Sequence, residues 1–287
     1  MIEAQHEAVQ TGAGPFEDGV LVEFSDLERD IFGLARIGSV PDTSSSSVLG
    51  LLLTEGKLVA GQSEILPGSK VAGWEGAVAS GVRLEIDEPL RRWTAAFSDG
   101  DTSFEVEAIA TSEPIELAGT VDEDATRRYE QLCEIRGEAI IRGNRREIAG
   151  VGRRAHEWGA PRPAAGGVLR SLYAASPDEA LTLTAVRPTA RDGHGAELVR
   201  AWSARQGAAP AAFDDARVST IYDPGGEIRK AGLELYMEGE EFPRRASGEA
   251  RAATVLEAGA SKVSISFMRW SIQGSPAQGS YTVVSPA

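Results

Sequence analysis

Apolar and polar residues alternate over most of the chain in short runs that are separated by turn residues. The alternation is clearest between residues 81 and 111, where apolar side chains recur at every second position: Val82, Leu84, Ile86, Trp93, Ala95, Phe97, Phe104, Val106 and Ala108. A period of two is typical of β-strands with one buried face. Asp99-Gly100 lies between two of these runs, and such a pair strongly favours a hairpin turn.

The same pattern recurs before and after this region. Comparable runs occupy residues 30–40, 47–53, 56–66, 132–152, 167–176, 180–188, 216–239, 245–259 and 261–284. Many of the 32 glycines and 14 prolines stand at the ends of these runs. Short strands with turns between them indicate sandwiches or barrels and disfavour an alternating βαβ sheet.

Departures from the strand pattern are few. Thr120 and Glu123 have the spacing of a helix-capping box, which predicts one short helix over residues 121–132. Four serines at 44–47 predict a polar loop tip. We therefore expect an all-β fold with at most one or two short helices.

The middle of the chain carries the best linker candidate. Residues 159–167, with the sequence GAPRPAAGG, have strand-like runs on both sides. A length of 287 residues suits either one large domain or two ordinary ones. We predict two consecutive β-domains, residues 1–160 and 161–287.

Composition removes several classes of protein. The formal net charge is −14, which opposes binding to nucleic acid or to anionic membrane surfaces. Cys133 is the single cysteine, so no internal disulfide can form. The start of the chain does not resemble a signal peptide, and no apolar run reaches the ~20 residues of a membrane span. We expect a cytoplasmic protein with no membrane span and no nucleic-acid partner.

Motifs for common cofactors are weak. Gly150-x-Gly152-x-x-Ala155 matches a dinucleotide fingerprint, but prolines at 161 and 163 prevent the helix that such a site requires. The three histidines, His6, His156 and His194, share no metal-ligand spacing, and His6 is expected in a frayed terminus. No cofactor and no metal are expected.

One histidine lies in an informative context. In a strand, His156 and Trp158 point to one face and Glu157 to the other. Imidazole can give or take a proton near neutral pH, so His156 is a candidate acid or base beside an apolar ligand. The alternative is that His156 and Trp158 belong to the core and that the imidazole is hydrogen-bonded there.

Residues 150–159, GVGRRAHEWG, resemble the G-x-G-x-R-x-H-x-W-G signature of the carotenoid 1,2-hydratase-like superfamily, also called hydroxyneurosporene synthase-like. Kievitone hydratase-like proteins and lipocalin-like cyclases belong to the same superfamily. Residues 90–111, 129–152 and 267–284 resemble other parts of its members. The resemblance implies two consecutive lipocalin-like β-barrels or sandwiches and a mostly apolar cavity. It also implies hydration of isoprenoid double bonds or cyclisation of polyenes and polyketides.

The resemblance also suggests site residues. His156 and Trp158 match the signature, whereas the family's downstream Tyr-x-Asp pair is matched only by Tyr173, because Ala175 replaces the aspartate. Glu157 is then a candidate for the missing acid. The predicted catalytic residues are His156, Glu157 and Tyr173, and the predicted substrate-binding residues are Trp158, Arg154, Trp270 and Trp93.

Three functions follow from these observations. The first is a cofactor-independent cyclase or hydratase, of lyase or isomerase type, acting on an apolar isoprenoid- or polyketide-like substrate. The second is a non-catalytic carrier of an apolar small molecule in the same cavity. The third is an interaction scaffold whose β-domains are packed solid.

Overall fold

A computed structural model of the chain describes residues 2–12, 16–40, 43–68, 71, 73–74, 77–117, 126–160, 166–176, 179–205, 207–258 and 260–287, without the side chain of residue 258. The chain divides near residue 161 into two compact units, called unit 1 and unit 2 in chain order. The predicted domain boundary at 160 and 161 adjoins residues 161–165, which lie outside the described residues.

The described residues of unit 1 form one antiparallel sheet of eleven strands in the order β4-β3-β2-β1-β11-β10-β8-β7-β6-β5, with β9 pairing with β10 as well. Its strands are β1 Glu17–Asp26, β2 Ile31–Val40, β3 Ser45–Thr54, β4 Lys57–Pro67, β5 Ala77–Ala79, β6 Val82–Glu88, β7 Arg92–Asp99, β8 Thr102–Ala110, β9 Ile115–Glu116, β10 Thr126–Ile141 and β11 Asn144–Gly159. The long β10–β11 hairpin forms the middle of the sheet.

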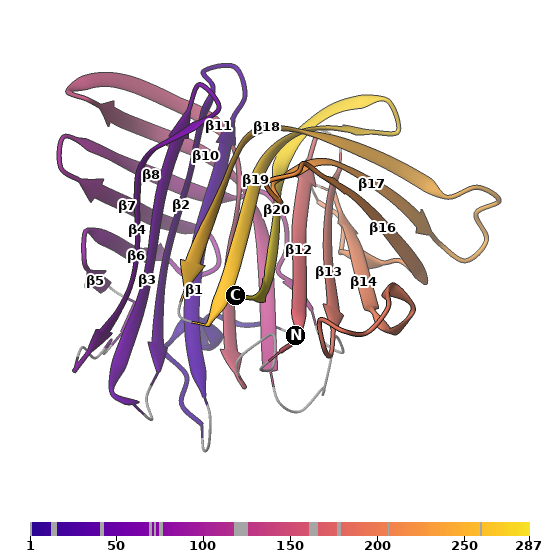
Figure 1. The fold of residues 1–287 in the computed structure, drawn as a ribbon, viewed down its shortest axis with the longest axis horizontal. Helices are drawn as coiled ribbons and strands as arrows, with labels where there is room; N and C mark the ends of the chain where they lie inside the picture. The colour runs from indigo at the N-terminus through magenta and orange to yellow at the C-terminus, as the bar shows by residue number, and fades with distance from the viewer. Residues whose placement is uncertain are drawn as a thin grey trace. The chain divides into compact units, whose positions relative to one another are not determined.

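The sheet of unit 1 curls into a half-barrel. Strands β1–β4 cross in front of β6–β8 (Figure 1), and β2 approaches β6 and β7 without pairing with them. The alternating apolar residues meet in this interior, where Phe24, Phe97 and Phe104 form one aromatic cluster. Gly33 and Gly50 make room for two of these rings, because a Cβ at either position would lie within 2.5 Å of a phenylalanine ring atom. This part of the interior is therefore filled.

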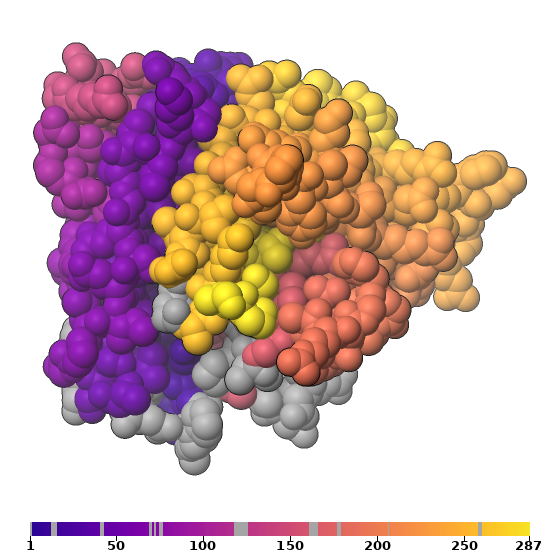
Figure 2. Space-filling model, viewed as in Figure 1, coloured from indigo at the N-terminus to yellow at the C-terminus, as the bar shows by residue number. Residues whose placement is uncertain are grey.

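In unit 2 the residues that the structure describes form an antiparallel sheet of nine strands in the order β15-β14-β13-β12-β20-β19-β18-β17-β16. Its strands are β12 Val168–Ala175, β13 Ala180–Arg187, β14 Leu198–Ala204, β15 Ala211–Ala212, β16 Asp215–Tyr222, β17 Ile228–Tyr236, β18 Arg244–Ala258, β19 Ser261–Ile272 and β20 Ser275–Pro286. The sheet also curls, since β14 approaches β16, and it encloses a second apolar core. The connection between β17 and β18 projects from the unit (Figure 2).

The prediction of an all-β chain with two consecutive β-barrels or sandwiches is confirmed, and the structure has the form of two curled half-barrel sheets in tandem. The described residues contain no α-helix, and their 3-10 turns, such as Ala4–Glu7 and His194–Ala196, are short.

Two local predictions are wrong. The expected helix at 121–132 lies outside the described residues up to 125, and from Thr126 onward it is strand β10. Pairing of β10 with β11, which joins Thr126 to Gly159 and continues to the hairpin turn, overrides the local helix signal. Ser45–Ser47 belong to β3 and not to a loop tip, because they pair with strands on both sides.

Candidate active site

Strand β11 carries the signature residues and presents its side chains to both faces of the sheet. His156 lies opposite Val20 of β1 and Tyr129 of β10, and Arg154 lies opposite Val22 and Gln131. Because directly paired residues share a face, Arg154, His156 and Trp158 point into the half-barrel with the core residues of β1. Glu157 points to the opposite face, as the alternation predicts.

His156 is buried and held by one acid. Its Nε2 lies 2.6 Å from Oδ1 of Asp18, and both side chains are almost fully buried. The Oδ2 atom of Asp18 accepts a hydrogen bond from the backbone N–H of Gln10 at 2.5 Å. An ionised carboxylate can only accept hydrogen bonds, so with Asp18 ionised the donor in this contact is Nε2.

The other ring nitrogen of His156 has no hydrogen-bond partner among the described residues, although it is buried. Three aromatic rings surround the imidazole: Trp158 with a centroid distance of 4.8 Å, Tyr129 at 5.8 Å and Trp74 at 5.9 Å. A buried polar atom without a partner calls for an explanation, and a catalytic role is one of those known. Nδ1 is therefore the atom at which this histidine can exchange a proton with a ligand.

Arg154 lies beside the histidine and forms a second polar cluster. Its guanidinium donates to both oxygens of Glu7, at 3.0 and 2.5 Å, and its Nε donates to Gln131 at 2.9 Å. Trp93 Nε1 and the Tyr129 hydroxyl also donate to Glu7, at 2.8 and 2.7 Å. Burial and the Glu7 carboxylate raise the pKa of the Tyr129 hydroxyl, so this group acts as a hydrogen-bond donor.

Residues 2–12, called the N-terminal strap, cover both clusters. His6 stacks on Trp158 with an interplanar angle of 18°, Glu7 binds Arg154, and Gln10 binds Asp18. Ile2 packs with Tyr129 and Trp158. The expectation that His6 lies in a frayed terminus is wrong, because the strap is tied to the interior of unit 1 at three points.

The opposite face of β11 holds a separate ionic network. Glu157 accepts a hydrogen bond from Arg128 at 2.6 Å, and Arg153 donates to Glu23 and Glu130 at 2.6 and 3.0 Å. Burial by itself lowers the pKa of the Arg153 guanidinium, but the two carboxylates outweigh this effect and raise it. Glu157 is therefore separated from His156 by the sheet and paired with an arginine.

Two predicted site residues belong to unit 2. Tyr173 on β12 is fully buried and points to the face opposite Leu172, which lies in the core of that unit. Trp270 on β19 is a core residue, and its ring lies over Gly248 of β18. The structure thus brings together four of the predicted residues: Arg154, His156, Trp158 and Trp93. The catalytic role of Tyr173 stays a prediction.

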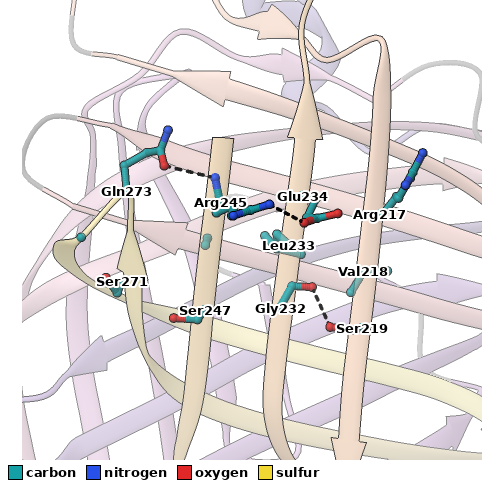
Figure 3. A pocket seen from close by; sticks show the side chains of 12 residues that line it. Arg217, Val218, Ser219, Gly232, Leu233, Glu234, Arg245, Ser247, Ser271 and Gln273 are labelled. Carbon is teal, nitrogen blue, oxygen red and sulfur yellow. Dashed lines mark hydrogen bonds and ion pairs between the residues drawn. The ribbon is translucent and has the colours of Figure 1, made fainter. Parts of the chain in front are cut away.

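A groove of about 590 Å³ lies on unit 2 and is lined by none of the predicted residues. It is formed by β16–β19, and Figure 3 shows Glu234 paired with Arg245 next to Gly232 and Ser219. Within the described residues, no group of three or more His, Cys, Asp or Glu is arranged to hold a metal ion. No helical segment among the described residues has the length and apolar character of a membrane-spanning helix.

Sequence reasoning missed four residues of the site: Glu7, Asp18, Trp74 and Tyr129. The one available signal was Asp18 at the start of a run that is otherwise apolar, Gly19 to Leu21. Its pairing with His156 depends on β1 lying beside β11, which joins segments 138 positions apart. Local sequence contains no information about that neighbour.

Sequence comparisons identify one family. The sequence matches the model of DUF7064, a domain of unknown function, over residues 2–283. No curated protein matches the chain by sequence.

Three solved structures share the fold. A protein described as an AttH from Nitrosomonas europaea matches with a TM-score of 0.75 and 11% identity, over 94% of this chain and 92% of that one. Kievitone hydratase from Nectria haematococca matches with a TM-score of 0.62 and 9% identity, over 100% and 93%. CghA matches with a TM-score of 0.61 and 11% identity, over 95% and 88%. The predicted resemblance to kievitone hydratase-like proteins is confirmed at the level of the fold.

Proposed function

The chain belongs to the DUF7064 family, and we propose that it is a cofactor-independent hydratase or cyclase acting on an apolar, isoprenoid- or polyketide-like molecule. The observation that carries the proposal is the buried His156–Asp18 pair, in which Nδ1 has no hydrogen-bond partner among the described residues and three aromatic rings lie around the imidazole. The fold shared with kievitone hydratase supports it.

His156 is the proton carrier in this proposal. When the imidazole is protonated, Asp18 stabilises the charge through Nε2, and the second proton lies on Nδ1. In a hydration, Nδ1 gives this proton to one carbon of a double bond, water bonds to the other carbon, and the water's surplus proton returns to Nδ1. In a cyclisation, a nucleophilic atom of the same molecule replaces water. The imidazole ends each cycle as it began.

The aromatic residues provide the apolar environment. Trp158, Tyr129 and Trp74 bring ring faces or edges to the imidazole from three sides. Ring faces attract positive charge, which develops on carbon when an alkene is protonated. The same rings exclude water from all but the reacting position, and they hold a flexible substrate in one folded shape.

Access to His156 requires a movement, because its side chain is only 1% exposed. The N-terminal strap is the segment to move: it covers Trp158 through His6 and Asp18 through Gln10. It pairs with no neighbouring strand along its described residues, so its displacement leaves the sheet intact.

The proposal is tested on protein purified from its own host. Solvent extraction and mass spectrometry identify the bound molecule, and the recovered molecule is then incubated with fresh protein. We expect a terpenoid or polyketide that the wild-type chain converts to a product heavier by one water, or to a ring-closed product of equal mass. His156→Gln should slow the conversion by about 10²–10⁴-fold while the fold is retained.

Two results contradict the enzyme. A ligand that the wild-type chain binds and returns unchanged identifies the alternative, a carrier of apolar molecules. A His156→Gln variant that converts the ligand at the wild-type rate removes His156 from the chemistry. If the protein is purified empty, the same assay is run with a panel of terpenoids and polyketides.

A further inference from the structure

We propose that Arg154, Trp93 and Tyr129 form a binding site for the carboxylate of an organic acid, and that Glu7 occupies this site as an internal ligand. Four hydrogen bonds from these three side chains converge on the Glu7 carboxylate, at 2.5 to 3.0 Å. The site lies in unit 1 and is separate from the groove on unit 2.

The donors have the chemistry of a carboxylate receptor. Arg154 binds both oxygens in the forked geometry that carboxylates favour, and the indole and phenol each add one neutral donor. Each of the three donors is nine-tenths or more buried. Gln131 orients the guanidinium from its other side. The guanidinium also lies over the rings of Trp93 and Tyr129, at 5.2 and 5.6 Å, which fixes its plane.

The occupant differs from the rest of the site. All three donors stand on strands of the sheet, on β7, β10 and β11, whereas Glu7 lies in a four-residue 3-10 turn of the strap. Receptor and occupant are therefore built on different parts of unit 1. A carboxylate from solution can replace Glu7 if the strap lifts, and the donors then keep their bonds to an oxyanion.

The ligand also needs an apolar body. Tyr129 is shared by the two clusters, because its hydroxyl binds Glu7 while its ring lies 5.8 Å from that of His156. Lifting the strap uncovers the face of Trp158 on which His6 stacks. A carboxylate at Arg154 would hold the apolar body of its molecule against Trp158 and near Nδ1 of His156. That this ligand is also the substrate rests on the proposed function; the binding site itself does not.

The test removes the internal ligand and replaces it from solution. Glu7→Ala leaves a space the size of a small carboxylic acid beside an unpaired Arg154. We expect the variant to melt several degrees below the wild type, and 100 mM propionate to raise its melting temperature by about 3 °C or more. Propionamide and sodium chloride at equal concentration are the controls for shape and ionic strength, and neither should have this effect.

Two further variants test whether the response to propionate depends on this site. Glu138→Ala removes an exposed partner of Arg145 and should not respond to propionate beyond the salt control. The double variant Glu7→Ala/Trp93→Phe lacks one donor and should need about tenfold more propionate for the same shift. Folded Glu7→Ala protein that responds equally to propionate and to sodium chloride would overturn the proposal.

If Glu7→Ala does not fold, Glu7→Gln keeps the volume and loses the charge. Propionate should then increase hydrogen exchange of residues 2–12 in Glu7→Gln, because the acid displaces the strap. Unchanged exchange in that variant also overturns the proposal. Neither result bears on conversion by wild type and His156→Gln, so failure here is distinguishable from failure of the proposed enzyme.

Discussion

Asp18 on β1 holds His156 on β11 through Nε2, at 2.6 Å, although the two residues are not paired in the sheet. Asp18 is opposite Trp158, and His156 is opposite Val20, so the contact is diagonal across two neighbouring strands. Diagonal neighbours on one face are within reach of long side chains. The contact commits Nε2 to Asp18, whereas Nδ1 has no hydrogen-bond partner among the described residues.

The tautomer of His156 should depend on Asp18. In the neutral wild-type imidazole we expect the proton on Nε2, because the Asp18 carboxylate can only accept. Asp18→Asn introduces an amide that can donate to Nε2, which favours the tautomer with the proton on Nδ1. Nitrogen-15 NMR of labelled histidine reports the tautomer directly, and the chain has only three histidines.

Asp26→Asn is the matched control for that measurement. Asp26 is a buried aspartate on the same strand, but it binds Arg29 and the backbone N–H of Ala149. The Asp26→Asn substitution should leave the His156 signals unchanged. Identical His156 spectra for wild type and Asp18→Asn would refute the assigned hydrogen bond.

The ionic network behind β11 should contribute strongly to stability. Arg153→Leu leaves the buried carboxylates of Glu23 and Glu130 without this cation, and it should lower the free energy of unfolding by about 3–5 kcal/mol. Urea denaturation measures the change. Arg145→Leu removes an arginine that is 75% exposed and paired with Glu138, and it should change stability by no more than about 0.5 kcal/mol. Equal effects of the two substitutions would contradict the role of burial.

The free energy of unfolding should fall at alkaline pH because the Cys133 thiol ionises more readily in the unfolded chain than in the folded one. Burial raises the pKa of this thiol from 9.0 to about 11. Between these values the unfolded chain releases the thiol proton and the folded chain retains it, so rising pH stabilises the unfolded state relative to the folded one. We expect Cys133 to account for a loss of about 2 kcal/mol from pH 9 to pH 11.

The measurement is the free energy of unfolding against pH for wild type and Cys133→Ala. The variant should lose less stability over this interval, because it has no thiol to titrate. Parallel curves for the two proteins would show that the thiol titrates alike in both states.

The filled part of unit 1 should not accept a methyl group at Gly50. A Cβ there would lie 2.2 Å from a ring atom of Phe97, so Gly50→Ala forces the ring or the strand to shift. We expect a loss of about 1–3 kcal/mol in urea denaturation. Gly193 has open space around it, and Gly193→Ala should stay within about 0.5 kcal/mol of wild type. A Gly50→Ala variant as stable as wild type would indicate unfilled volume beside Phe97.

The alternation of residues was sufficient to predict strands, because a half-buried strand imposes a period of two on its own sequence. That is why the runs at 82–86, 93–97 and 104–108 became β6, β7 and β8 and why both units were expected to be all-β. Local signals failed where pairing decided the outcome. The capping-box spacing at Thr120 and Glu123 predicted a helix, but the residues from Thr126 onward form strand β10 because they pair with β11.

The class of the fold, the face of β11 on which His156 and Trp158 lie, and the separation of Glu157 from them all follow from the local pattern of residues. The surroundings of the histidine depend on the tertiary structure. Asp18, Trp74 and Glu7 reach the site from three segments far from residue 156 in the chain. The order of strands in the curled sheet creates these contacts, and that order depends on packing among all the strands, which no single segment encodes.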